Sequence, residues 1–320
     1  PALLFGMYNV GYQHFGALGQ LDAVGFTQMF LFGLMKVLPI IIVTYIVGLG
    51  IEFVFAQFRG HDVNEGFLVT GILIPMVMPV TTPLWMIAVS TAFSVIFCKE
   101  VFGGTGMNVW NPALVARAFL FFAYPAQISG DAVWISADGI EKMADGFTGA
   151  TPMAKAAMGD NSFDLWNAFI GLIPGSIGET SKLAILIGAL ILIITGIGSW
   201  RIMVSTLLGA LFMGILLNTV AGDNAYMALP FWHHLFIGGL MFGVVFMATD
   251  PVSAAQTTKG KWIYGFLIGI LAIMIRVINP AYPEGVMMAI LLMNTFAPLI
   301  DYFVVQGNIK RRLKRANVKA

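Results

Sequence analysis

Charged residues and cysteine are scarce in this sequence. Only 10% of its 320 residues are Asp, Glu, Lys or Arg, and Cys98 is the single cysteine. One cysteine excludes an internal disulfide and any four-cysteine iron–sulfur or zinc site built by this chain alone. His233 and His234 have no further ligands at metal-binding spacing, so no metal site is expected. No nucleic-acid-binding patch is present either, so no nucleic-acid partner is expected.

Apolar residues are abundant. They make up 58% of the chain, and the mean hydropathy is +0.86, which is far outside the range of soluble proteins. Several apolar runs are long enough to cross or enter a bilayer. The sequence therefore predicts an all-α, multi-pass integral membrane protein in contact with membrane lipid. Apolar segments are expected at residues 34–55, 66–80, 84–97, 109–124, 183–196, 202–220, 233–248, 263–277 and 285–305.

The start of the chain is less regular. Residues 1–8 are apolar but too short to span a bilayer, so we interpret them as the end of a truncated first helix. Residues 10–28 are Gly-rich and polar and are expected to form a loop.

The two halves of the chain share motifs 168 residues apart. Thr81-Thr82-Pro83 matches Thr249-Asp250-Pro251, and Asn111-Pro112-Ala113 matches Asn279-Pro280-Ala281. Short, Pro-interrupted apolar segments are typical of membrane proteins in which broken helices line a site. We therefore expect about ten transmembrane helices in two inverted five-helix repeats with short broken helices. The predicted divisions are residues 1–124 and 183–309 for the repeats, 125–182 for an extracytoplasmic segment and 310–320 for a basic tail.

Positive charges predict the orientation in the membrane. Five cations lie between Lys310 and Arg315, and cations are enriched on the cytoplasmic side. A cytoplasmic tail, with alternating spans, also places Arg59, Lys99, Arg201, Lys259 and Lys261 inside. The only basic residues in the loops on the outer side are then Lys142, Lys155 and Lys182.

The outer segment contains a hydroxyl-bearing stretch, Asp145-Gly146-Phe147-Thr148-Gly149-Ala150-Thr151. Its composition alone fits an ordinary turn. The stretch also resembles the flavin-attachment motif Asp-Gly-x-Ser/Thr-Gly-Ala-Thr, in which FMN is joined to the last threonine through a phosphodiester. Residues 108–114, 119–131, 173–179, 246–253 and 279–285 extend the resemblance over the whole chain. Together they resemble the family formed by the B subunits of the sodium-translocating NADH:quinone oxidoreductases; the paralogous D subunits of the Rnf ferredoxin:NAD oxidoreductases are the alternative.

The resemblance implies a translocase that reduces ubiquinone with electrons from NADH while Na⁺ crosses the bacterial inner membrane. It implies covalent FMN on Thr151, with Thr148, Gly149 and Ala150 beside it, and a noncovalent riboflavin contacted by Asn108 and Asn111. Other subunits of a membrane redox complex are the implied partners. The flavin segment would be periplasmic and the C-terminal tail cytoplasmic, and no catalytic residue is assigned to this chain.

Several of these residues also have a structural interpretation. Asn111-Pro112 is an ordinary helix start, and Arg117 is costly in lipid, so it should pair with a buried acid or a cofactor. Asp250, Glu52 and Asp301 are candidates for an ion pathway because intramembrane acids suit hard cations. Glu52 could equally be a helix-end acid in contact with water. A flavin-free inverted-repeat transporter and a membrane anchor for other subunits remain open as alternatives.

Overall fold

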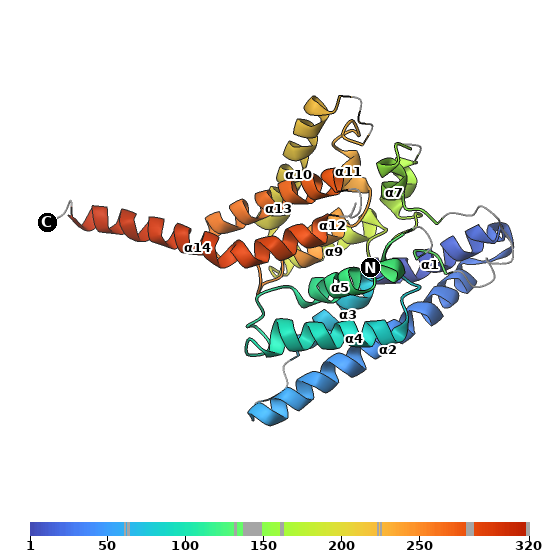
Figure 1. Ribbon diagram of the computed structural model, residues 1–320, viewed down its shortest axis with the longest axis horizontal. Helices are drawn as coiled ribbons and strands as arrows, with labels where there is room; N and C mark the ends of the chain where they lie inside the picture. Colours follow the sequence, from blue (N-terminus) through green and yellow to red (C-terminus); the bar gives the residue numbers. More distant parts are fainter. Residues whose placement is uncertain are drawn as a thin grey trace.

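The protein is described by a computed structural model covering residues 1–60, 62, 65–130, 133–136, 149–160, 163–222, 224, 226–279 and 285–317. Every regular element within these residues is helical (Figure 1). The expectation of an all-α membrane protein is therefore confirmed.

The first half of the chain is built around one long helix. The elements are α1 (Ala2–Ala17), η1 (Leu21–Ala23), α2 (Phe26–Arg59), α3 (Phe67–Met76), α4 (Leu84–Ser94), the π-helical turn η2 (Val95–Glu100) and α5 (Pro112–Ala123). Helix α2 is 34 residues long and is followed by its C-cap residue Gly60, whose φ of +67° is readily adopted only by glycine.

The loop expected at residues 10–28 is wrong at both ends, because α2 begins at Phe26 and α1 continues to Ala17. Its polar residues are buried against the rest of the protein. Asn9 donates a hydrogen bond to the carbonyl of Ile173 over 2.9 Å, and the His14 ring lies 2.9 Å from the carbonyl of Ser136. Gly33 of α2 packs directly on the Met7 carbonyl, where any side chain would collide. These partners are distant in sequence, so composition alone does not reveal the helix.

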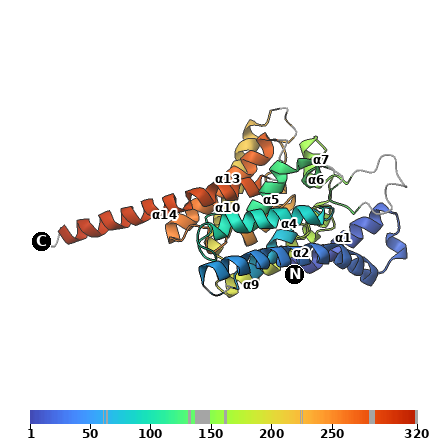
Figure 2. The same ribbon diagram turned by 60° about the horizontal axis from the view of Figure 1, so that its bottom comes forward.

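Three short helices, α6 (Pro125–Ile128), α7 (Pro152–Ala157) and α8 (Leu165–Ile170), lie between the halves. The second half comprises α9 (Lys182–Ile194), α10 (Trp200–Val220), α11 (His233–Phe236), α12 (Leu240–Phe242), the π-helical turn η4 (Gly243–Met247), α13 (Thr258–Ile278) and α14 (Val286–Asn317). Residues 233–248 are therefore not one continuous helix. Gly238, at φ +67°, separates α11 from α12. Residues 310–317 extend α14 away from the helical bundle (Figures 1 and 2).

Four helices among the described residues are long and apolar enough to cross a membrane. They are residues 26–59, 200–220, 258–278 and 286–315, and α3, α5 and α9 are shorter apolar helices. The total of ten spans stays a prediction.

The order of elements follows the internal sequence repeat. In each half a long helix is followed by a short one, a Pro-containing break, and two more helices. Helix α14 runs toward the C-terminus on one side of the molecule, whereas its counterpart α5 leads toward α7 on the other (Figure 1). This one pair of corresponding helices runs in opposite directions, as expected for an inverted repeat, and the division of the chain into two inverted repeats stays a prediction.

Candidate functional site

A cavity of about 290 Å³ lies where the two halves meet. Asn108 and Asn111 of the first half and Asp250 of the second half all line it. The walls also include Leu73 of α3, Lys99 of η2, Leu192 of α9, Phe246 of η4 and Thr249. Mostly apolar walls with a few polar groups are typical of a ligand site, and the volume is close to the lower end of the usual range.

Asn111 is the N-cap of α5. Its side-chain oxygen accepts hydrogen bonds from the backbone N–H of Ala113 at 3.0 Å and of Leu114 at 3.4 Å, and Pro112 follows at the first helical position. The helix-start interpretation is therefore confirmed. Asn108 donates to the carbonyl of Trp110 over 3.1 Å. Because both amides also line the cavity, capping is compatible with the predicted riboflavin contact, which stays a prediction.

Asp250 lies in the turn that follows η4. One carboxylate oxygen accepts from the backbone N–H of Val252 at 3.2 Å, and the other accepts from the Ser253 hydroxyl at 2.6 Å. The matching Thr82 of the first half donates to the carbonyl of Pro79 over 2.9 Å. Asp250 is half-buried, so the second half presents a carboxylate to the cavity where the first half has only a hydroxyl.

Glu52 is held in a buried ion pair with Lys99. The Lys99 ammonium donates a hydrogen bond to a carboxylate oxygen of Glu52. Glu52 is 4% exposed and Lys99 is 3% exposed. The alternative that Glu52 is a water-facing helix-end acid is therefore wrong. Lys99 lines the cavity and Glu52 is not among its lining residues, and the Glu52 charge is already compensated by Lys99.

We expect Lys99→Met to destabilise the protein strongly, because it leaves the Glu52 carboxylate buried without its cation. Removing one partner of a buried ion pair costs about 3–5 kcal/mol. The double variant Glu52→Gln with Lys99→Met should recover most of that loss. The midpoint of thermal unfolding in detergent measures both effects, and equal losses in the single and double variants would contradict this account.

Asp301 is placed elsewhere. Its carboxylate accepts from the backbone N–H of Gln256 at 2.6 Å and of Thr257 at 3.0 Å, and from the Thr257 hydroxyl at 2.5 Å. It thus joins α14 to the start of α13, and it is not among the residues that line the 290 Å³ cavity. The structure does not bring Asp301 together with Asp250 at that cavity, and its part in an ion pathway stays a prediction.

Arg117 of α5 is only 3% exposed and has several partners. Its guanidinium donates to the Ser176 hydroxyl over 2.8 Å and to the carbonyl of Val77, and lies 3.6 Å from a carboxylate oxygen of Glu179. The expectation that Arg117 pairs with a buried acid is confirmed. Its role toward a flavin stays a prediction.

Thr151 is the N-cap of α7. Its hydroxyl oxygen accepts from the backbone N–H of Ala154 at 3.2 Å, and Pro152 is the first helical residue. Gly149 and Ala150 are buried, whereas Thr151 is partly exposed. Thr148, with residues 145–147, lies outside the described residues.

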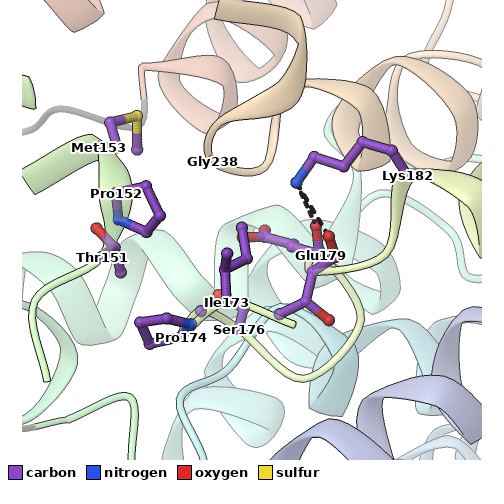
Figure 3. Close-up of a pocket in the computed structure, with 11 residues that line it drawn as sticks. Thr151, Pro152, Met153, Ile173, Pro174, Ser176, Glu179, Lys182 and Gly238 are labelled. Carbon is purple, nitrogen blue, oxygen red and sulfur yellow. Dashed lines mark hydrogen bonds between the residues drawn. The ribbon is translucent and has the colours of Figure 1, made fainter. Parts of the chain in front are cut away.

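A second, smaller cavity of about 20 Å³ opens beside Thr151 (Figure 3). Lys182, Glu179, Ser176 and Gly238 form its other sides, together with Pro152, Met153, Ile173, Pro174, Gly175 and Thr180. Its volume is enough for one water molecule and too small for a flavin ring. A flavin attached to Thr151 would therefore have its ring outside this cavity, with only its attachment end near the cavity.

Lys182 and Glu179 were not predicted as site residues. The sequence indicated residues 173–179 only as one of the segments that carry the family resemblance. It indicated Lys182 only as a basic residue of an outer loop. The one available signal was a lysine at the first position of an apolar helix, where the helix dipole does not favour a cation. Among the described residues, no group of three or more His, Cys, Asp or Glu could hold a metal ion.

The chain is similar to known proteins along nearly its whole length. A sequence model of the NQR2, RnfD, RnfE family matches residues 1–310. The B subunit of the Na(+)-translocating NADH-quinone reductase of Chromohalobacter salexigens is 50% identical over 98% of this chain and 81% of its own length. The proteins of the same name from Pseudoalteromonas atlantica and Neisseria meningitidis serogroup B are 50% and 46% identical, over 98% and 99% of this chain and 83% and 84% of their own lengths.

Proposed function

Because this chain belongs to the NQR2, RnfD, RnfE family, we propose that it is the B subunit of a Na⁺-translocating NADH:quinone oxidoreductase. The observation that carries the proposal is sequence similarity along nearly the whole chain to proteins of that name, which are 50% identical to it. The subunit works with other subunits of a membrane redox complex, with ubiquinone as the substrate and Na⁺ as the transported ion. The alternative, the D subunit of an Rnf complex, draws support from the family description alone.

Covalent FMN on Thr151 is the first part of the proposal. It is supported by the motif at residues 145–151, by the partial exposure of Thr151, and by the small residues before it. A buried ammonium, that of Lys182, lines the cavity beside Thr151 and can compensate a phosphate charge. A bound flavin would supply the one- and two-electron chemistry that protein side chains lack.

Riboflavin in the 290 Å³ cavity is the second part. Asn108 and Asn111 line it, and amide groups offer both a donor and an acceptor to the polar edge of a flavin ring. Leu73, Leu192 and Phe246 supply apolar surface for the ring faces.

We expect Asn111→Leu to lower the riboflavin content of the purified protein while the covalent FMN remains. Because Asn111 also caps α5, this variant loses the cap as well, at a cost of about 1 kcal/mol. Asn111→Ser separates the two roles, since serine caps a helix well but has no amide. Extraction of noncovalent flavin and its chromatographic quantitation is the measurement. Full riboflavin in Asn111→Ser would leave the cap as the only role of this residue.

The ion pathway is the third part. Asp250, at the break of the second half, is proposed as its main acid, with Glu52 and Asp301 as further acids. The two repeats, residues 1–124 and 183–309, frame the pathway. The segment 125–182 lies on the periplasmic side of the bacterial inner membrane and the tail 310–320 on the cytoplasmic side.

A denaturing gel tests the proposed function cheaply. A covalent flavin survives denaturation, so the band of this chain should fluoresce under ultraviolet light. A dark band from protein purified within its complex would favour the flavin-free transporter or the membrane anchor.

A further inference from the structure

Lys182 is a buried cation in the wall of the cavity beside the proposed attachment site. It is 1% exposed, and its ammonium donates hydrogen bonds to the carbonyls of Glu179 at 3.1 Å and of Thr180 at 3.2 Å. In Figure 3, Lys182 and Thr151 lie on opposite sides of the cavity, and the end of the Lys182 side chain points toward Glu179. An ammonium has three donors, so these two carbonyls leave one for a further acceptor.

The position of Lys182 in its helix does not explain its burial. Lys182 is the first residue of α9, a 13-residue helix capped by Ser181, whose side-chain oxygen accepts from the backbone N–H of Ala184 at 3.1 Å. The N-terminal end of a helix carries a partial positive charge, so a cation there is unfavourable and an anion is favourable. The helix end and the ammonium therefore both favour an anion at the same place.

No carboxylate of the described residues forms an ion pair with Lys182. The nearest acid along the chain, Glu179, lies with one carboxylate oxygen 3.6 Å from the guanidinium of Arg117. The hydrogen-bond partners of the Lys182 ammonium are neutral carbonyls. The Glu179 carboxylate stabilises the Lys182 charge through space, but it also pairs with Arg117, and the charge of Arg276 opposes that of Lys182. Burial of a charge that is only partly compensated is costly, so the site is suited to a further anion.

We propose that Lys182 is a positioning residue that binds the phosphodiester joining FMN to Thr151. This inference rests on the proposed covalent attachment of FMN. A phosphodiester carries one negative charge beside the threonine oxygen, and a cavity of about 20 Å³ has room for a phosphate oxygen but not for a flavin ring. The Lys182 ammonium holds that oxygen through a charge-assisted hydrogen bond, which is shorter and stronger than a neutral one. The attachment end is thereby fixed, and the flavin ring keeps a constant position outside the cavity.

Three variants within the intact complex test this role: Lys182→Met, Lys182→Arg and the control Lys155→Met. Lys155 lies in α7, one turn from Thr151, but is partly exposed and is not part of the cavity wall. We expect all three variants to retain the FMN adduct in intact mass spectrometry. Lys182→Met should change the ³¹P chemical shift of the phosphodiester and lower the fluorescence anisotropy of the FMN. Lys182→Arg should preserve most of the anisotropy, and Lys155→Met should match the unsubstituted protein.

A double-mutant cycle with Thr151→Ala separates the loss of the phosphate contact from a general destabilisation of the fold by Lys182→Met. If FMN supplies the anion, Lys182→Met lowers the unfolding temperature when Thr151 is present but not in the FMN-free Thr151→Ala background. Equal losses in both backgrounds, or a ³¹P shift and an anisotropy unchanged in Lys182→Met, would overturn the role of Lys182. Absence of any adduct from the unsubstituted protein would instead overturn the proposed function.

Discussion

Replacing Thr151 with alanine is expected to abolish the covalent FMN adduct completely. The nucleophile for a phosphodiester is a hydroxyl, and alanine has none. Thr151→Ser should retain at least part of the adduct, because a primary hydroxyl remains competent. Peptide mapping by mass spectrometry after digestion identifies the modified residue, and the Thr151→Ala complex should assemble but fail to pass electrons.

The helical role of Thr151 calls for a further control. Because Thr151 caps α7, Thr151→Ala also removes a cap, worth about 0.5–2 kcal/mol. Thr151→Asn keeps a good cap and lacks the hydroxyl, so it should lose the adduct while retaining α7. Thr148→Ala should keep the adduct. An adduct on Thr148, or one that survives Thr151→Ala, would overturn the assignment.

The second large effect is expected at Asp250. Asp250→Asn removes the charge that faces the cavity between the halves, yet its amide oxygen can still accept from the backbone N–H of Val252. We expect Na⁺-dependent turnover to fall at least about tenfold, which corresponds to about 1.4 kcal/mol of lost stabilisation of the rate-limiting state. Covalent FMN should be unchanged, because the carboxylate does not line the cavity beside Thr151.

Ser253→Ala is the matched control for Asp250. It removes the 2.6 Å hydrogen bond to the carboxylate and leaves the charge in place. Turnover measured against Na⁺ concentration should therefore change less in Ser253→Ala than in Asp250→Asn. If Asp250→Asn keeps the unsubstituted rate and Na⁺ dependence, Asp250 is not part of the ion pathway.

The long helices could be predicted from the sequence because each contains a predominantly apolar run that is long enough to enter or cross a bilayer. Helices α2, α10, α13 and α14 include the segments expected at 34–55, 202–220, 263–277 and 285–305, apart from one terminal residue of the last. The prediction failed where tertiary contacts decide the structure. Buried polar residues such as Asn9 and His14 made the end of α1 resemble a loop, and the left-handed backbone at Gly238 divides a segment that is apolar throughout.

The candidate site was predictable in part. Asn111 and Asp250 were singled out because each belongs to one of the two repeated Pro-containing motifs, and both line one cavity. The ion pair of Glu52 with Lys99 joins residues 47 positions apart. The ion pair of Arg117 with Glu179 joins α5 to the segment that precedes α9. No local pattern specifies such partners. The sequence does not predict a role for Lys182 for a similar reason, because only its position beside Thr151 in space distinguishes it from a loop lysine.

The intact mass of the unsubstituted chain, purified within its complex, tests the central claim most directly. The account predicts a mass that exceeds that of the polypeptide by one FMN less one water, with the increment confined to the peptide that contains Thr151. A chain with the mass of the bare polypeptide would contradict the claim that this subunit carries covalent flavin.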